Sequence, residues 1–178
     1  LSNFDAVVLG IRVYNTNDRA KFYQKHLHNY VANGGTLIVQ YNTNHRVKVD
    51  QVAPYPIKLS KDRVTDETSE VRIINPTHEL LNYPNKISSS DFDGWVQERG
   101  LYFPNEWDAN FETIISINDK NESPKEGSLL VAKYGEGNFI YTGLSFFREL
   151  PAGVSGAYKL FANMLSIGKN NIKKPLKN

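Results

Sequence analysis

Two apolar stretches near the start of the chain each lead into polar and aromatic side chains. The first covers residues 5–10 and the second covers 36–41. In an open α/β sheet, ligands bind beyond the carboxyl ends of the strands, so side chains at these positions could form one site. The candidate residues are Arg12, Tyr14 and Asn15 after the first stretch, and Gln40, Tyr41 and Asn42 at the end of the second.

The chemistry of these six side chains suits a neutral or anionic polyol better than an apolar ligand. Arg offers a planar fork of donors, Asn and Gln offer paired donor and acceptor groups, and Tyr offers a flat face with a hydroxyl. The alternative is structural, because the same residue types cap strands and satisfy the backbone of loops.

Two Glu-Arg pairs lie among aromatic residues later in the chain. Glu98 and Arg99 fall within the aromatic segment 95–103, and Arg148 and Glu149 follow two phenylalanines. Each pair is either a wall of a binding site or a buried ion pair, which needs further hydrogen bonds to be stable. We expect both pairs to form an electrostatically held rim around the same crevice.

Standard catalytic motifs are absent or incomplete. The chain has no Cys, which excludes thiolate nucleophiles, zinc–thiolate sites and iron–sulfur clusters. Ser145 follows Gly143-Leu144 but lacks the closing Gly of a nucleophile elbow. The four His residues have no spacing that gathers three metal ligands. We therefore predict no catalytic residue, metal or cofactor in this domain.

Length and charge restrict the class of protein. The chain has 178 residues, which suits one domain. Its 21 Lys and Arg against 19 Asp and Glu leave a net charge of +2 without a basic face, which argues against a dedicated nucleic-acid binder. No apolar run approaches the roughly 20 residues of a membrane span.

The pattern of apolar residues predicts a mixed sheet. Strand 5–10, a helix with apolar positions from Ala20 to Val31, and strand 36–41 form a βαβ unit with parallel strands. Strands 128–133 and 138–143 form an antiparallel hairpin, and a closing helix begins at Ser155. Less regular sequence lies between, with short strands expected at 71–74 and 113–117 and a turn entering a short helix at 75–81.

These elements predict a three-layer α/β domain over residues 1–168, with a mostly parallel mixed sheet, followed by a lysine-rich tail at 169–178. The chain starts without Met or a signal peptide, and we expect the natural protein to extend upstream.

Four segments carry a family resemblance: 4–15, 30–42, 135–143 and 148–153. They resemble the C-terminal region of large bacterial PIG-L-type deacetylases of the GlcNAc-PI de-N-acetylase family. In that group, a zinc-dependent deacetylase domain is followed by further domains. The last of these looks like a class I glutamine amidotransferase or the related ThuA-like domain. The resemblance implies a flavodoxin-like fold, upstream domains as partners, and a periplasmic or secreted location.

The chain differs from this family at the positions of the family's catalytic residues. Where an amidotransferase carries its nucleophilic Cys after a central strand, this chain has Gln40-Tyr41-Asn42. The glutaminase reaction is therefore excluded, and the His that ThuA-like members carry near that turn is also missing. The zinc motif of the deacetylase is absent, and the opening strand of the amidotransferase fold is expected upstream.

Three functions remain open at this stage. The first is a non-catalytic accessory domain of a carbohydrate-processing deacetylase, which binds glycan or a neighbouring domain through the strand-end residues and the two Glu-Arg pairs. The second is a ThuA-like hydrolase or isomerase that acts on a sugar, with Glu98 or Glu149 as general base. The third is a structural or dimerisation module with an apolar surface patch.

Overall fold

The computed structural model describes residues 1–169, and within them the main sheet has five strands in the order β1-β2-β9-β8-β6. Strands β1 (Ala6–Leu9), β2 (Thr36–Gln40) and β9 (Gly137–Thr142) run parallel to one another. Strand β8 (Leu129–Tyr134) is antiparallel to β9, and β6 (Phe111–Thr113) is antiparallel to β8. The predicted mixed sheet, parallel first pair and terminal hairpin are confirmed.

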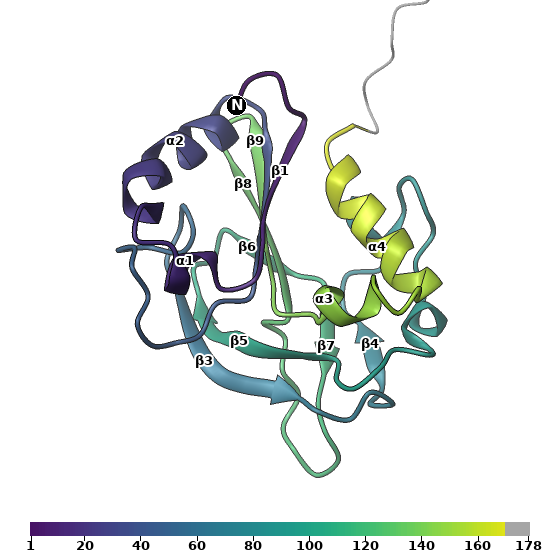
Figure 1. The fold of residues 1–178 in the computed structure, drawn as a ribbon. Coiled ribbons are helices and arrows are strands. Elements are labelled where there is room, and N and C mark those ends of the chain that lie inside the picture. The colour runs from purple at the N-terminus through teal and green to yellow at the C-terminus, as the bar shows by residue number, and fades with distance from the viewer. Residues whose placement is uncertain (170–178) are drawn as a thin grey trace, which may run out of the picture.

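Helices cover both faces of this sheet. Helix α2 (Ala20–Ala32) lies on one face and α4 (Ser155–Ser166) on the other (Figure 1). Side chains of β2 alternate between the two faces, because successive residues of a strand point to opposite sides. Leu37 and Val39 pack in the core on the α2 side, and Ile38 packs in the core on the α4 side.

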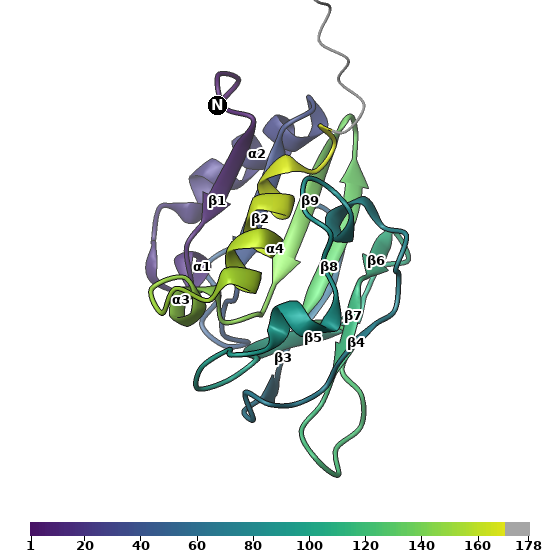
Figure 2. The ribbon, with the colours of Figure 1, turned by 90° about the vertical axis from the view of Figure 1, so that its right-hand side faces the viewer.

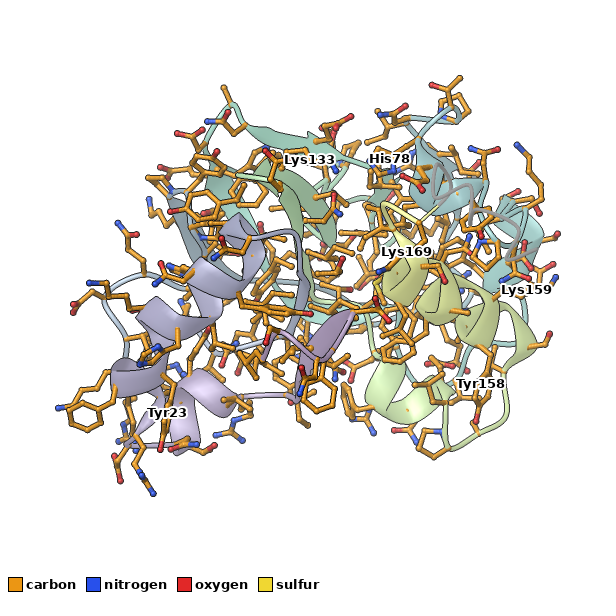
Figure 3. The ribbon with its side chains drawn as sticks, turned by 90° about the horizontal axis from the view of Figure 1, so that it is seen from above. Tyr23, His78, Lys133, Tyr158, Lys159 and Lys169 are labelled. Atoms are coloured by element: carbon orange, nitrogen blue, oxygen red, sulfur yellow. The ribbon has the colours of Figure 1, made fainter. Side chains whose placement is uncertain are left out.

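Helix α2 buries only part of its predicted apolar positions. The helix starts at Ala20. Just before it, the Asn17 Oδ1 accepts a hydrogen bond from the Arg19 amide at 2.9 Å. Leu27 and Val31 are buried as predicted, but Tyr23 is 45% exposed. Figure 3 shows Tyr23 on the outer side of α2, away from the sheet.

The middle of the chain contains more strand than its polar composition suggests. Strands β3 (Ile57–Val64) and β5 (Gly100–Trp107) pair antiparallel, with irregular register, in a second sheet. Strands β4 (Val71–Ile73) and β7 (Ile115–Ile117) form a third sheet (Figure 2). The strand expected at 113–117 is therefore two strands, β6 and β7, in different sheets. Two 3₁₀ turns, η1 (Glu79–Leu81) and η2 (Ser89–Phe92), pack against α4.

Strand β5 crosses the carboxyl end of the main sheet. The Leu101 amide donates to the Gly143 carbonyl at 2.9 Å, and the Ser145 amide donates to the Arg99 carbonyl at 3.1 Å. A Cβ added to Gly100 would lie 2.3 Å from the Gly143 carbonyl oxygen, so only glycine permits this approach. The short helices α1 (Val13–Thr16) and α3 (Phe146–Glu149) lie at the same end (Figure 1).

The first strand forms one border of the main sheet. Within residues 1–169, β1 pairs only with β2. Leu1, Phe4 and Val8 on or beside it are 53%, 63% and 36% exposed. Apolar exposure of this kind is unusual for a parallel strand, which is normally covered on both faces.

The C-terminal expectations are tested only in part. Of the predicted tail, residues 170–178 lie outside the described residues. Lys169 is described, and its ammonium pairs with the Asp5 carboxylate. No helix in the described range is long and apolar enough to cross a membrane.

Candidate functional site

The carboxyl ends of β1 and β2 meet at Tyr41. The Arg12 amide donates to the Tyr41 carbonyl at 2.8 Å, which ties the end of β1 to the end of β2. The Tyr41 ring stacks on Tyr102 of β5 with a centroid separation of 5.8 Å, and it contacts Phe147 of α3 at 5.5 Å. We call the following group the edge cluster: Arg12, Tyr41, Arg63, Glu98, Tyr102, Phe147 and Arg148.

Glu98 holds the charged part of the edge cluster together. Its Oε1 accepts from the Arg148 Nε at 2.9 Å, and its Oε2 lies 3.4 Å from the Arg63 Nη2. Arg148 also donates to the Gln97 side chain, and its guanidinium lies 4.9 Å from the centre of the Phe147 ring. Because only 6% of the Glu98 side chain is exposed, two arginines stabilise a nearly buried carboxylate.

The expected rim of two sequence-adjacent Glu-Arg pairs is therefore wrong in its pairing. Glu98 pairs across the site with Arg148, and Arg99 makes no ion pair within 4 Å with either carboxylate. The Arg99 guanidinium donates to the carbonyls of Ser69 and Phe92. It is a buried structural arginine that anchors the segment leading into β5.

Glu149 is fully buried and has no ion-pair partner within 4 Å among the described residues. Its Oε2 accepts from the Val96 amide at 2.9 Å, and its Oε1 lies 3.4 Å from the Ser145 Oγ. The Ser145 hydroxyl proton is directed to the Glu98 carbonyl at 2.5 Å. Burial raises the pKa of Glu149. A protonated Glu149 could donate to Ser145 and complete this chain of hydrogen bonds.

Ser145 is itself buried and hydrogen-bonded. It has no exposed surface, and its hydroxyl is engaged by the backbone. The absence of a nucleophilic role for Ser145 stays a prediction.

Tyr14, Asn15 and Asn42 have structural contacts. The Asn42 Oδ1 accepts from the Tyr14 amide at 2.9 Å, and its Nδ2 donates to the Gln40 carbonyl at 3.0 Å. The Asn15 amide exchanges hydrogen bonds with the backbone of Thr43. Tyr14 is 0% exposed, and burial raises its pKa to about 12. These residues fix the loops that carry Arg12 and Tyr41, and Gln40 is the half-buried last residue of β2.

Backbone strain is concentrated around the edge cluster. Arg12, Gln97 and Tyr102 have φ angles of 58°, 68° and 54°, a region that non-glycine residues seldom adopt. They are three of the five such residues in the described range. Strained residues gather at functional sites, where surrounding contacts hold them in place.

The electrostatics centre on the Tyr41 hydroxyl. Burial raises the pKa of Tyr41, and Arg12 and Arg148 oppose that rise while Glu98 adds to it. The charges of both arginines and of the carboxylate therefore act on this phenol, although Arg12 is far from Arg148 in sequence.

A depression of about 270 Å³ continues the edge cluster and is lined by Lys61, Arg63, Leu101 and Tyr102. Sequence reasoning missed it, because the segment that forms β3 has no continuous apolar run. The available signal was the alternation of exposed Lys61 and Arg63 along a strand. Larger depressions of about 430 Å³ lie beside α2, and one of them is also lined by Leu9, Val13 and Tyr14 at the carboxyl end of β1.

No group of three His, Asp or Glu residues in the described range is arranged to hold a metal ion. The arrangement is suited to binding: two stacked tyrosines, a third aromatic ring, and arginines oriented by one carboxylate.

Comparisons with known proteins support the fold. No protein-family model and no curated protein matches the sequence. A cytoplasmic protein of Salmonella typhimurium matches with a TM-score of 0.57 and 16% identity, over 93% of this chain and 72% of that one. A second one, from strain LT2, has a TM-score of 0.56 and 12% identity, over 93% of this chain and 72% of that one.

The third comparison is with an enzyme. A β-galactosidase of Bacillus circulans sp. alkalophilus matches with a TM-score of 0.53 and 14% identity. The match covers 92% of this chain but 22% of the β-galactosidase, so the likeness concerns one part of a much longer protein. At these identities the similarities establish a mixed α/β fold and carry no information about the reaction.

Proposed function

We propose that this chain is a non-catalytic accessory domain of a carbohydrate-processing deacetylase, and that it binds a saccharide at the edge cluster. The observation that carries the proposal is the Tyr41–Tyr102 stack beside the arginines that Glu98 orients. Sugar rings present apolar faces that stack on aromatic side chains, and their hydroxyls hydrogen-bond to guanidinium, amide and phenol groups. Tyr102 and Phe147 are half-buried, so part of each ring is accessible to such a ligand.

The proposed function also implies a particular type of α/β fold. We infer a three-layer, flavodoxin-like domain of the class I glutamine amidotransferase or ThuA-like type. The parallel strands β1, β2 and β9 with α2 and α4 on opposite faces support this inference. The resemblance to PIG-L-type deacetylases supplies the deacetylase as the neighbouring domain. The β-galactosidase similarity supports the fold alone.

A ThuA-like hydrolase or isomerase with a glutamate base is less well supported. A general base must reach the proton that it removes. Glu98 is engaged by two arginines, which occupy both of its oxygens. Glu149 has no exposed surface. This geometry favours binding over proton transfer.

The proposal is tested by calorimetric titration with a panel of neutral and acidic oligosaccharides. Tyr102→Ala is expected to weaken binding of the responding ligand by about tenfold, equal to about 1.4 kcal/mol, because it removes the stacking face. Phe22→Ala is the matched control, since this aromatic residue of α2 is 66% exposed and lies outside the edge cluster. If no oligosaccharide binds, or if both variants behave alike, the proposed function is wrong.

A structural or dimerisation role is the second candidate, and one observation favours it. Leu1, Phe4 and Val8, which lie on β1 or just before it, are all exposed. An unpaired strand edge with apolar side chains can pair with a second chain. This role would use a different surface from the edge cluster, so the two candidates are separable by mutation.

A further inference from the structure

The depression beside Tyr102 has a charged wall and an aromatic wall. Lys61 and Arg63 come from β3, and Leu101 and Tyr102 come from β5. The antiparallel pairing of β3 with β5 places Arg63 opposite Leu101. Tyr102 therefore belongs both to the stack with Tyr41 and to the lining of this depression.

Glu98 orients the Arg63 guanidinium but does not fully pair its charge. Its Nη2 is 3.4 Å from the Glu98 Oε2, yet 56% of its side chain is exposed. Glu98 makes its shorter contact, 2.9 Å, with Arg148. One carboxylate is thus shared between two guanidinium groups, which leaves donor groups of Arg63 free to meet a further anion.

Two further cations, Lys61 in the depression and Arg12 in the edge cluster, have no carboxylate of their own. Within residues 1–169, no carboxylate lies within 4 Å of the charged groups of Lys61 or Arg12, whereas Lys58 on the same strand pairs with Glu106. Arg63 and Arg148 share Glu98, and the lining of the depression contains Lys61 and Arg63 but no carboxylate. An excess of positive charge beside an aromatic face favours an anionic ligand.

We propose that this depression is a subsite for the acidic group of a saccharide, so that the ligand is a sugar bearing a carboxylate, such as a uronic acid. The inference rests on the proposed saccharide-binding function and assigns its ligand class. The sugar ring stacks on Tyr102, and its carboxylate meets Arg63 and Lys61 at the edge of the ring. Arg accepts a carboxylate through two parallel hydrogen bonds, which also fixes the orientation of the ring.

A matched pair of ligands separates the charge from the sugar. Trigalacturonic acid and its full methyl ester have the same rings, but only the acid carries carboxylates. Calorimetric titration of the whole chain is expected to give at least about tenfold tighter binding of the acid, a preference that weakens as salt is raised. Sodium acetate and a panel of neutral oligosaccharides are titrated as control ligands.

Single-residue variants then test which side chains cause the preference for the acid over the ester. Lys61→Gln and Arg63→Gln are expected to reduce the acid-over-ester ratio to near one, because each removes a cation from the subsite. Lys58→Gln is the matched control: it removes the same charge from the same strand, outside the depression, and is expected to keep the ratio. All three side chains are exposed, and thermal unfolding checks that each variant folds.

Each outcome decides a separate question. Equal binding of acid and ester, or binding of neutral sugars alone, overturns the acidic subsite but leaves the proposed function standing. A preference that survives both Lys61→Gln and Arg63→Gln also overturns the subsite. Acetate binding as tightly as the trisaccharide overturns the role of the sugar ring. No binding by any saccharide overturns the proposed function itself.

Discussion

At the scale of single residues, the edge cluster is built from side chains held in costly positions. Arg12, Gln97 and Tyr102 adopt positive φ angles, which cost a non-glycine residue about 1–3 kcal/mol each. Each is fixed by neighbours: the Arg12 amide by Tyr41, the Gln97 side chain by Arg148, and the Tyr102 ring by Tyr41. The fold maintains this strain where the edge cluster brings aromatic and charged groups together.

Glu149 gives a pH-dependent prediction at this scale. Burial raises its folded-state pKa above the ordinary value of 4.5. Between that value and the raised pKa, the folded protein binds more protons than the unfolded chain. The contribution of Glu149 to the free energy of unfolding is therefore full below about pH 4.5 and is lost as pH rises through the folded-state pKa.

We expect Glu149→Gln to remove this loss, because a neutral amide can accept from the Val96 amide and donate to the Ser145 Oγ. Urea unfolding at a series of pH values from about 4.5 to 8 measures how the free energy of unfolding changes with pH. The Gln variant should lose less unfolding free energy over that range than the natural chain. Glu149→Ala is the control, and it should cost about 1–3 kcal/mol throughout by leaving the Val96 amide unpaired. Parallel pH profiles for the natural chain and the Gln variant would contradict the assignment.

At the scale of elements, the site depends on how closely β5 approaches the end of β9. The two backbones meet at Gly100 and Gly143, with the Leu101 amide donating to the Gly143 carbonyl. This approach brings Glu98 and Tyr102 to the ends of β1 and β2. The site is thus shared between the main sheet and the β3–β5 pair, and neither contains it alone.

We expect Gly100→Ala to separate these elements. The added Cβ would lie 2.3 Å from the Gly143 carbonyl oxygen, which cannot be relieved by a side-chain rotation. The predicted cost is about 1–3 kcal/mol in unfolding free energy, with loss of saccharide binding. Gly10→Ala is the control, because a Cβ at Gly10 meets no atom within 4 Å. Chemical denaturation and calorimetry of both variants check the prediction, and equal stability of the two would contradict it.

At the scale of the whole molecule, the sheet is protected unequally. Helix α4 and the turns η1 and η2 cover one face, and α2 covers the other, but the β1 border is apolar and solvent-exposed in the described residues. Natural sheets usually protect such borders with lysine, proline or a bulge. Val8 at the middle of β1 has no such protection.

We expect the chain to self-associate through this border, and Val8→Lys to weaken the association by about tenfold or more, because a buried lysine would lose its hydration. Sedimentation velocity over a range of protein concentrations measures this. Phe22→Lys is the control, since Phe22 is more exposed but lies on α2. A chain that stays monomeric at every concentration, or a similar effect of both variants, would contradict the second candidate function.

The sequence by itself determined the regular parts of this protein. The strands β1, β2, β8 and β9 and the helices α2 and α4 follow from short apolar runs and from helical spacing, which depend on neighbouring residues alone. It also placed Arg12 and Tyr41 at one edge, since parallel strands end together. The absence of Cys excluded a thiolate nucleophile within this sequence without any structure.

Only the tertiary structure decided which of those residues form a site. The pairing of Glu98 with Arg148, the burial of Glu149 and the structural roles of Asn15 and Arg99 depend on contacts between segments far apart in the chain. The only local signal of strand β3 was the alternation of exposed Lys61 and Arg63, and the strand pairs irregularly with β5. Its Arg63 became part of the edge cluster through that long-range pairing, which no local pattern encodes.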